Sequence, residues 1–539
     1  MSSTDDENII STMLEFDALS SAIEKEVQEF GGPHDEKISE INNILKIIAK
    51  LRGEIKAQEK LIENLVNLSR SHQEENGEVT TRKNIRDKHY MMRAEQMKKL
   101  HDLYDELLLT VERWRTMNLV GRHRELHPLN KEVCPICLED VPITCLNSVQ
   151  TFWCCGNFIC CRCMQASFAG ASNPGQLRMK NCPCCREKIF DATMEESARQ
   201  VERQAKRGRP SAQAMMGERY LNGHINSAHP SSDVQEALKW LKLAAEQNHP
   251  DAIRMIAQLH HGVYGKVKEV EQCHIKARAL LKEAADLGNL KAQRDYSTMC
   301  RLGQGGPEDK SEAARYYTLA YSQKGLSFEK DYENSPLKVY DDSRDKVLHA
   351  GLFLGIFHYY GEGGFTKNVF TAKYYLEECV KESEKQCSYF GTKLSSAHLP
   401  ALPPYPAEIA AGSDADAYMY LAACLMELQE RTFDRNITGY SIPGYTSVPR
   451  AISLYRKSVK LGIDSPNKYA QHSKEVLKNL VSQLKRFCGH CGVASEDIPE
   501  GMLKACGRCH STWYCGKECQ IEHWKAGHKS DCVSQQVQV

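Results

Sequence analysis

Hydrophobic residues recur at steps of three, four and seven from residue 38 onward, which is the pattern of a helix with one long apolar stripe. The stripe consists of Ile38, Ile41, Leu45, Ile48, Ile55, Ile62 and Val66. Arg52 and Glu59 interrupt it. A second stripe follows the polar break around Gly77 and consists of Met97, Leu100, Tyr104, Leu107, Val111 and Trp114. The pattern predicts a coiled-coil region at residues 38–127, either a helical hairpin within one chain or a homodimer contact between two.

Shorter apolar periods begin near residue 211, and they repeat. Three segments align at an interval of forty residues, namely SAQAMMGERYLNG at 211–223, DAIRMIAQLHHGV at 251–263 and KAQRDYSTMCRLG at 291–303. Each is followed by a second amphipathic segment, and the pair returns near residues 349 and 416. About five helix pairs are therefore expected over residues 211–482, with polar or Pro-rich insertions between some of them.

These helix pairs resemble Sel-one-like repeats, which are short helix pairs of the tetratricopeptide kind. The resemblance implies a mainly α fold, in which stacked pairs form a right-handed superhelix whose concave face binds peptides or proteins. Small residues such as Ala245 and Ala285 are expected where two helices touch, and Gly288 where a helix ends in a left-handed residue. Tyrosines such as Tyr316 and Tyr374 are expected between helices rather than in a ligand cage.

Composition narrows the function classes. A chain of 539 residues predicts roughly three or four domains. Lys plus Arg and Asp plus Glu number 70 each, so net charge gives no reason to expect nucleic acid or an anionic membrane as a partner. Residues 1–37 have no basic segment followed by an apolar core, so no signal peptide is expected. They are expected to be a flexible N-terminus, with a short helix that ends at Gly31-Gly32-Pro33 as the alternative. The most apolar run, residues 348–360, is too short for a transmembrane helix.

The spacing of the cysteines is the strongest indication of chemical function in this sequence. The chain has 23 cysteines, and most lie in two clusters, at residues 134–185 and 488–532. Two cysteines separated by two residues on a tight turn can direct both sulfurs at one ion, and zinc takes four such ligands tetrahedrally. We therefore expect reduced thiolates that bind zinc rather than disulfides, which places the protein in a reducing compartment, the cytoplasm or the nucleus.

The first cluster contains three C-x2-C pairs, which are Cys134 with Cys137, Cys160 with Cys163, and Cys182 with Cys185. Together with Cys155 they resemble a RING finger, here at residues 130–190. The resemblance implies a cross-brace, in which the first pair shares a zinc with the second pair and Cys155 shares another with the third. The family usually has His as the sixth ligand, and here that position is Asn157, a poor zinc ligand. We expect Cys154 to replace it; the alternatives are Cys184 and weak metal binding at this second site.

The RING resemblance implies catalysis by orientation, without a side-chain nucleophile. Ubiquitin ligases of this family bind a ubiquitin-conjugating enzyme and hold its ubiquitin in a reactive pose. The matching contact positions here are Ile136, Pro183 and Arg186. Their structural alternatives are core packing for Ile136 and a solvated surface charge for Arg186.

The second cluster resembles a MYND zinc finger over residues 488–532, with every ligand position filled. The implied ligands are Cys488, Cys491, Cys515 and Cys519 for one zinc and Cys506, Cys509, His528 and Cys532 for the other. In that family a Gln and a Trp four residues apart line a groove for Pro-containing peptides, and Gln520 and Trp524 match. The alternative for Trp524 is a core residue in a very small domain, and His523 is expected to be exposed.

The sequence thus predicts a mainly α protein with a coiled coil, a RING finger, a helical solenoid and a MYND finger, holding four zinc ions. We interpret it as a RING-type ubiquitin ligase that recruits substrates through its repeats and MYND finger. The alternative is a non-catalytic zinc-finger scaffold, which Asn157 favours. Expected partners are a ubiquitin-conjugating enzyme and ubiquitin for a ligase, and other proteins or peptides in either case. No methyltransferase segment is recognisable beside the MYND finger, which disfavours lysine methylation.

Overall fold

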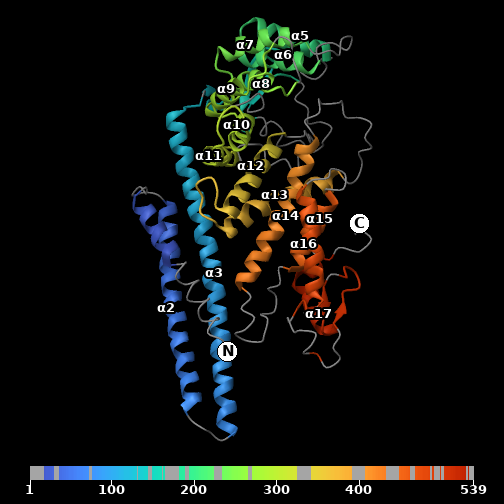
Figure 1. Ribbon diagram of the computed structural model, residues 1–539. Helices are drawn as coiled ribbons and strands as arrows, with labels where there is room; N and C mark the ends of the chain where they lie inside the picture. Colours follow the sequence, from blue (N-terminus) through green and yellow to red (C-terminus); the bar gives the residue numbers. More distant parts are fainter. Residues whose placement is uncertain are drawn as a thin grey trace. The chain divides into compact units, whose positions relative to one another are not determined.

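The computed structural model describes residues 17–29, 36–71, 76–129, 131–143, 149–160, 162–163, 181–187, 194–223, 233–264, 270–323, 342–390, 407–432, 448–461, 468–485, 488–490, 498, 503–510, 512–529 and 532. They are mainly helical (Figure 1) and fall into two compact units. The first unit comprises Met1–Met117, Asn368–Val380 and Ala410–Val539, and the second comprises Asn118–Lys367 and Lys381–Ile409. Among the described helices, none is long and apolar enough to cross a membrane.

Two long helices, α2 (Glu36–Ser71) and α3 (Asn76–Leu126), carry the two apolar stripes, and they run side by side in the first unit (Figure 1). Both stripes contribute to one buried cluster, which includes Ile41, Ile48, Ile55, Leu100, Tyr104, Leu107, Val111 and Trp114. The stripes therefore pack against each other within one chain, as a hairpin. The side chains of Ile62, Val66 and Met97 lie outside the described part of the structure.

A helix at residues 17–29 packs on this hairpin, within the segment that was expected to be flexible. Ile23 and Val27 join the buried cluster of the hairpin. Asp17 forms an ion pair with Arg52, the residue that interrupts the first stripe. The interruption is thus explained by an acidic partner from the N-terminal helix, which the periodicity of α2 alone does not reveal.

The repeats of the second unit consist of short helices, namely α6 (Pro210–Asn222), α7 (Val234–Ala245), α8 (Pro250–His261), α9 (His274–Asp286), α10 (Leu290–Leu302), α11 (Lys310–Ser322) and α12 (Asp342–Tyr360). An additional helix, α5 (Met194–Lys206), precedes them. Pro210 and Pro250 begin α6 and α8, where a missing N–H costs no helical hydrogen bond. Gly223 and Gly262 end the same helices with left-handed φ values of 70° and 86°.

Small residues bring the paired helices together. Ala285 is fully buried in α9, which confirms the repeat register expected there, and Ala245 in α7 is half-buried. A Cβ atom on Gly217 of α6 would lie 2.5 Å from the side chain of Leu241 on α7, so this contact requires glycine. Tyr316 is fully buried, as expected for a residue between helices.

Helices continue in the first unit, where α14 (Ala407–Thr432), α15 (Val448–Leu461) and α16 (Lys468–Leu484) follow α13 (Val369–Phe390). The buried hydroxyl of Ser458 on α15 donates a hydrogen bond of 2.9 Å to the Ala415 carbonyl of α14. Tyr375 on α13 donates one of 3.2 Å to Glu112 on α3. The helix pair expected near residues 416 and 450 is therefore present as helices in contact.

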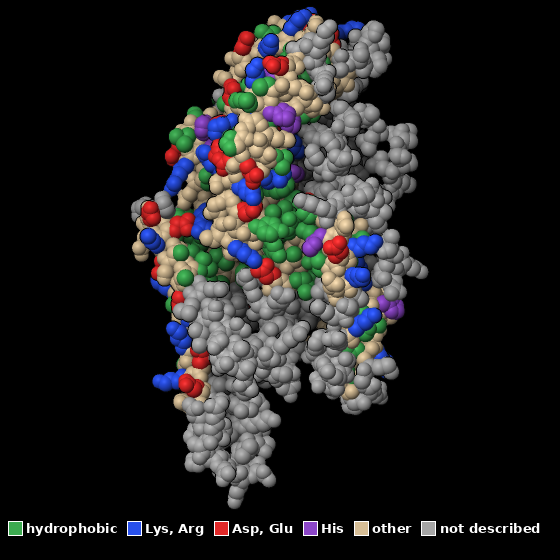
Figure 2. Space-filling model, viewed as in Figure 1, with side chains coloured by type: hydrophobic (Ala, Val, Ile, Leu, Met, Phe, Trp, Pro, Cys, Tyr) green, Lys and Arg blue, Asp and Glu red, His purple; other side chains and the backbone are tan. Residues whose placement is uncertain are grey.

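The described strands form antiparallel pairs, β1 (Lys131–Val133) with β2 (Asp140–Pro142), β3 (Val149–Phe152) with β4 (Asn157–Cys160), and β5 (Lys504–Ala505) with β6 (Trp513–Tyr514). These strands are too short to form a core, and their function is to position cysteines at the turns between them. On the face that Figure 2 shows, acidic and basic side chains are interspersed, as expected from their equal numbers.

Candidate metal centres

A tight turn carries the first cysteine pair between β1 and β2. The Cys134 N–H donates to the Glu139 carbonyl at 3.0 Å, and the Leu138 N–H donates to the Cys134 carbonyl at 2.9 Å. Leu138, directly after the pair, has a left-handed φ of 59°. These bonds close the turn and leave the sulfurs of Cys134 and Cys137 within 4.8 Å of each other.

The same turn recurs at two further pairs. The Arg186 N–H donates to the Cys182 carbonyl at 2.8 Å, and the His510 N–H donates to the Cys506 carbonyl at 3.0 Å. Arg186 and His510 have φ values of 64° and 49°. A residue other than glycine is strained by roughly 1–2 kcal/mol in this conformation. The same left-handed position therefore recurs at three turns, and each turn carries a cysteine pair of a different sulfur group.

The first group of four sulfurs comprises Cys134, Cys137, Cys160 and Cys163. The Cys134 and Cys163 sulfurs are 3.9 Å apart, and the Cys137 and Cys160 sulfurs are 3.6 Å apart. Four sulfurs bound tetrahedrally to zinc at 2.3 Å would be separated by about 3.8 Å. A disulfide would instead require about 2.05 Å. The spacing therefore fits a zinc ion and excludes a disulfide.

The second group comprises Cys154, Cys155, Cys182 and Cys185. The Cys155 and Cys182 sulfurs are 3.7 Å apart, and the Cys154 and Cys185 sulfurs are 3.5 Å apart. Cys184 lies outside this group. Asn157 is exposed at the start of β4. The structure thus brings Cys154, rather than Cys184, to the three other sulfurs.

Cys154 reaches this position because of the turn between β3 and β4. Gly156 adopts a left-handed φ of 76°, and its N–H donates to the Phe152 carbonyl at 2.7 Å. The buried Gln204 of α5 donates from Nε2 to the Cys154 carbonyl at 3.2 Å. A Cβ atom on Gly156 would lie 2.7 Å from Gln204 Oε1. Sequence reasoning missed Gln204, because nothing in its local pattern connects α5 to a turn some fifty residues earlier.

Ionisation of the thiols is uneven in each group. Burial disfavours the Cys134 thiolate, but backbone N–H groups lower its pKa to about 6, with the largest contribution from Cys137. Backbone N–H groups likewise outweigh burial at Cys182 and lower its pKa. Burial raises the pKa of Cys163 to about 12 and that of Cys184 to about 11. Cys134 is therefore largely ionised at neutral pH, and Cys182 loses its proton more readily than an isolated thiol, so a cation can bind first at these two sulfurs.

The C-terminal finger contains a third group of four, which comprises Cys506, Cys509, His528 and Cys532. All four are buried; the Cys506 and Cys532 sulfurs are 3.7 Å apart, and His528 Nε2 is 3.7 Å from the Cys509 sulfur. A π-helical turn (Trp524–His528) after α17 (Lys517–His523) carries His528 to this position. Cys488, Cys515 and Cys519 converge separately, and Cys491, the expected fourth ligand, lies outside the described residues.

The expectation that His523 is exposed is wrong. Its ring is 7% exposed, shares a hydrogen bond of 3.0 Å with the Tyr514 hydroxyl, and stacks on His528 at 4.9 Å. Burial lowers its pKa to about 4, with a further contribution from His528. A finger this small has few apolar residues, so a neutral imidazole fills part of its core. His523 ends α17 directly before the π-helical turn, and the identity of the residue alone does not reveal that this position is buried.

Gln520 and Trp524, the expected peptide-binding pair, lie one turn apart, and the Trp524 N–H donates to the Gln520 carbonyl. Both side chains are half-buried. Trp524 also packs against the buried cysteine cluster, and its ring meets His528 edge-on at 5.9 Å. Trp524 therefore contributes to the core while part of its surface remains available to a ligand.

The three expected contact positions of the first finger are all exposed. Ile136 is 48% exposed, which excludes the core-packing alternative for it. Arg186 has a fixed backbone, because its N–H closes the turn at Cys182. Nearby on the same finger, Arg162 forms an exposed ion pair of 3.0 Å with Glu139.

Comparison with known families identifies two parts of the chain. A model for the MYND finger matches residues 488–532. A model for the Sel1 repeat matches residues 210–249, 250–289, 290–324 and 350–378. The helix pair near 416 and 450 lies beyond these matches.

Two solved structures are similar to this chain. One is a Sel1 repeat protein from Oxalobacter formigenes, with 16% identity, a TM-score of 0.31, and coverage of 53% of this chain and 93% of that chain. The other is c5321, a protective antigen present in uropathogenic Escherichia coli strains and displaying an SLR fold, with 15% identity, a TM-score of 0.24, and coverage of 54% and 69%. The family matches and the cysteine geometry together lead to one conclusion, that this chain is a zinc-finger protein with Sel1 repeats and a C-terminal MYND finger.

Proposed function

We propose that this protein acts by binding other proteins, and that its first finger, residues 130–190, is a RING-type ubiquitin ligase. The observation that carries the proposal is the alternating order of the cysteine pairs, in which Cys134 and Cys137 group with Cys160 and Cys163, and Cys154 and Cys155 with Cys182 and Cys185. Two independent zinc loops would instead group each pair with its nearest neighbour along the chain. The interleaved order supports the cross-brace that the resemblance to a RING finger implies.

Zinc fits both groups of the first finger, since four cysteine sulfurs at these spacings form a closed tetrahedral site. Such an ion supplies folding energy and takes no part in chemistry. The third group, with three cysteines and His528, is a closed site of the same kind. The proposal therefore assigns structural zinc to every finger site.

Ligase activity on this finger requires exposed contacts rather than a nucleophile. Ile136 is an exposed apolar side chain of the kind that anchors small interfaces. In the proposal, Ile136 and Pro183 bind the conjugating enzyme. Arg186 orients the ubiquitin, because a guanidinium can donate to two carbonyl groups at once and its backbone is fixed by the turn.

The remaining modules recruit the substrate in this proposal. Stacked Sel1 repeats offer an extended surface for a folded partner or a peptide. Gln520 and Trp524 of the MYND finger offer a second, smaller surface for Pro-containing peptides. Neither module needs a catalytic side chain for this task.

The decisive test is discharge of ubiquitin from a preloaded conjugating enzyme onto free lysine, measured over a panel of conjugating enzymes. Wild-type protein is expected to accelerate discharge. Arg186→Ala should leave binding of the conjugating enzyme intact and slow discharge roughly thirtyfold, the rate equivalent of losing about 2 kcal/mol of orientation. Ile136→Ala should instead weaken binding, by about 1–3 kcal/mol.

Arg162→Ala is the matched control, because Arg162 is an exposed arginine on the same finger with its own acidic partner. It should discharge ubiquitin at the wild-type rate. Zinc content is measured for every variant, so that loss of the fold is distinguished from loss of contact. Failure of the wild type with every conjugating enzyme would refute the ligase proposal.

The second candidate is a scaffold that binds proteins and transfers nothing. Sel1 repeats and the MYND finger, the two parts matched by family models, favour it, because both are protein-interaction modules. In that case the discharge assay is negative for wild type, while binding of Pro-containing peptides is retained and is weakened by Trp524→Ala.

A further inference from the structure

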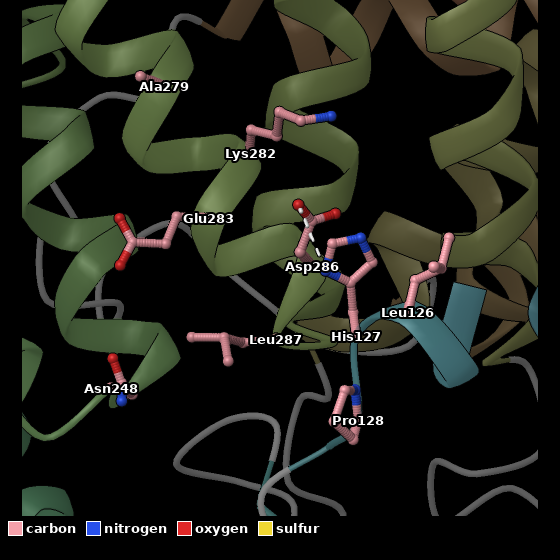
Figure 3. Close-up of a pocket in the computed structure, with 9 residues that line it drawn as sticks. All are labelled: Leu126, His127, Pro128, Asn248, Ala279, Lys282, Glu283, Asp286 and Leu287. Atoms are coloured by element: carbon pink, nitrogen blue, oxygen red, sulfur yellow. Dashed lines mark ion pairs between the residues drawn. The ribbon is translucent and has the colours of Figure 1, made fainter.

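A group of ligand atoms without cysteine lies at the end of α3, in the second unit. His123 in the last turn of α3 and His127 just after it are four residues apart, so both rings lie on one side of the helix end. Their ring centroids are 4.7 Å apart. Asp286, the last residue of α9, completes the group; its carboxylate oxygens lie 3.8 Å from His123 Nε2 and 3.9 Å from His127 Nδ1. Figure 3 shows His127 and Asp286 directed toward each other.

The buried state of His123 is the feature that needs an explanation. The residue is 4% exposed, and its Nε2 atom has no hydrogen-bond partner. Buried polar atoms in proteins nearly always have one. This nitrogen faces Asp286 from beyond hydrogen-bonding distance, which leaves room for an atom between them.

The protonation state of His123 suits a metal. Burial lowers its pKa to about 4, because the attraction of Asp286 is the smaller effect and the His127 ring and two basic side chains add repulsion. The ring is therefore neutral near pH 7, so its contact with Asp286 is no ion pair. Neutral imidazole is the form that donates a lone pair to a transition metal.

The surrounding charges also favour a cation. The C-termini of α3 and α9 meet here, and each helix end carries about half a negative charge. Lys282 and Arg315 oppose this field, but both pair with Glu312, at 2.9 Å and 3.5 Å. Glu283 lines the adjoining pocket and adds a negative charge.

Asp286 is held in place by a second residue. The Tyr316 hydroxyl donates a hydrogen bond to Asp286 Oδ1. Metal-binding carboxylates typically have such a partner, which fixes their orientation. The remaining side of the group opens into a pocket of about 470 Å³, lined in part by His127, Asp286 and Lys282 (Figure 3).

We propose that His123, His127 and Asp286 bind one divalent transition-metal ion, zinc being the best match, with water from the pocket as fourth ligand. Nitrogen and oxygen ligands of tetrahedral zinc lie about 3.4 Å apart, so the present distances need to close by about half an ångström. The ion would fasten the end of α3 to the second Sel1 repeat, residues 250–289. This site is independent of the proposed ligase function.

Arg315 competes with the metal in a specific way. Its Nη2 atom lies 3.3 Å from His123 Nδ1 and donates to it, which places the ring proton on Nε2. Metal binding at Nε2 moves that proton to Nδ1, so Arg315 must withdraw toward Glu312. Removing Arg315 should therefore strengthen metal binding, an effect that damage to the fold does not produce.

The experiment uses the full-length protein, dialysed until only the tightly bound zinc of the cysteine sites remains, with cobalt(II) as the probe. Soft thiolate sites retain zinc, so added cobalt reports sites without cysteine. Equilibrium dialysis should find about one bound cobalt per chain, with a visible spectrum that lacks thiolate charge-transfer bands. His127→Ala and Asp286→Asn should each weaken binding about hundredfold or more, since even an outer partner of a metal site contributes tenfold to a hundredfold.

Three further variants make the outcome unambiguous. His261→Ala is the matched control, because His261 lies beside His274 but joins no group of three metal ligands within the described part of the chain, so it should not affect cobalt binding. His127→Cys should add a thiolate charge-transfer band, and Arg315→Ala should tighten binding roughly threefold or more by removing a nearby positive charge. Absence of cobalt binding in the wild type, or binding that survives both His127→Ala and Asp286→Asn, would overturn the proposal.

Discussion

Cys154 illustrates how a single residue can replace an expected ligand. The resemblance to a RING finger places a histidine where this chain has Asn157, and the β3–β4 turn brings the sulfur of Cys154 to the other three instead. The turn residues Leu138 and Arg186 of the same finger take left-handed backbone conformations, as does His510 in the C-terminal finger. At this scale the finger is defined by backbone geometry as much as by the identity of its ligands.

Exchange of single cysteines tests this substitution. Cys154→Ala should reduce the zinc content of the purified protein by one ion per chain, because three sulfurs hold structural zinc weakly. Cys184→Ala should leave it unchanged, since Cys184 lies outside the group. Metal analysis after dialysis gives the answer, and a Cys184→Ala protein that loses an ion would contradict the assignment. Adding Asn157→His to Cys154→Ala tests whether the usual family ligand restores the site.

At the scale of helices, buried small residues allow the paired helices of the repeats to pack closely. Ala285→Leu should overpack the contact of α9 and lower the free energy of unfolding by about 1–3 kcal/mol. Ala279→Leu on the same helix is the control, because Ala279 is exposed and should change stability little. Chemical denaturation followed by circular dichroism measures both, and equal effects would contradict the packing described here.

Much of this element structure follows from sequence, for identifiable reasons. Helical periodicity identifies the buried faces of α2 and α3. Recurring alanines and glycines identify the repeats. Both patterns can be recognised in the sequence because each depends only on neighbours within one helix. Contacts between distant segments have no such pattern. The Asp17–Arg52 pair, the Gln204 bond to Cys154 and the approach of His123 to Asp286 arise only when separate elements meet.

The candidate metal sites likewise combine features that follow from local sequence with features that depend on contacts between distant segments. Cysteine spacing identified most ligands of each finger, because their chemistry lies in tight turns. The grouping of the pairs came from the resemblance to known fingers, and the choice of Cys154 over Cys184 needed the structure. His523 was misjudged, since its burial depends on how a few residues share a very small core. The H-x3-H spacing of His123 and His127 was visible, but its third member lies on a helix far along the chain.

At the scale of the whole molecule, stability has two separate sources. The buried cluster of the C-terminal finger consists of Cys488, Cys506, Cys509, Tyr514 and Cys532, so nearly all of its core is made of proposed ligands. The repeats instead bury alanine, leucine and tyrosine. Zinc is therefore expected to hold the fingers, and apolar packing the helices.

Removal of zinc should separate these two contributions. A strong chelator is expected to unfold the fingers, which lose roughly 10 kcal/mol of metal binding per structural site. The fluorescence of Trp153, Trp513 and Trp524, all in the fingers, should shift toward that of exposed tryptophan. The helical circular dichroism signal should remain nearly unchanged, and its collapse together with the fingers would show that zinc also supports the repeats.

The hydrogen bond from Gln204 to Cys154 helps to fix the distance between the first finger and the first repeat. Gln204 of α5 donates a hydrogen bond to the Cys154 carbonyl. Trp153, the residue before Cys154, packs against Val201 and Ala205 of α5 and against α6, the first repeat helix. The first finger and the first repeat are thus joined by a packed surface as well as by the connecting chain. A partner bound to that repeat would therefore lie at a fixed distance from the first finger. If the first finger has the proposed ligase activity, the lysines that receive ubiquitin would depend on the shape of the substrate rather than on the random search of a tether.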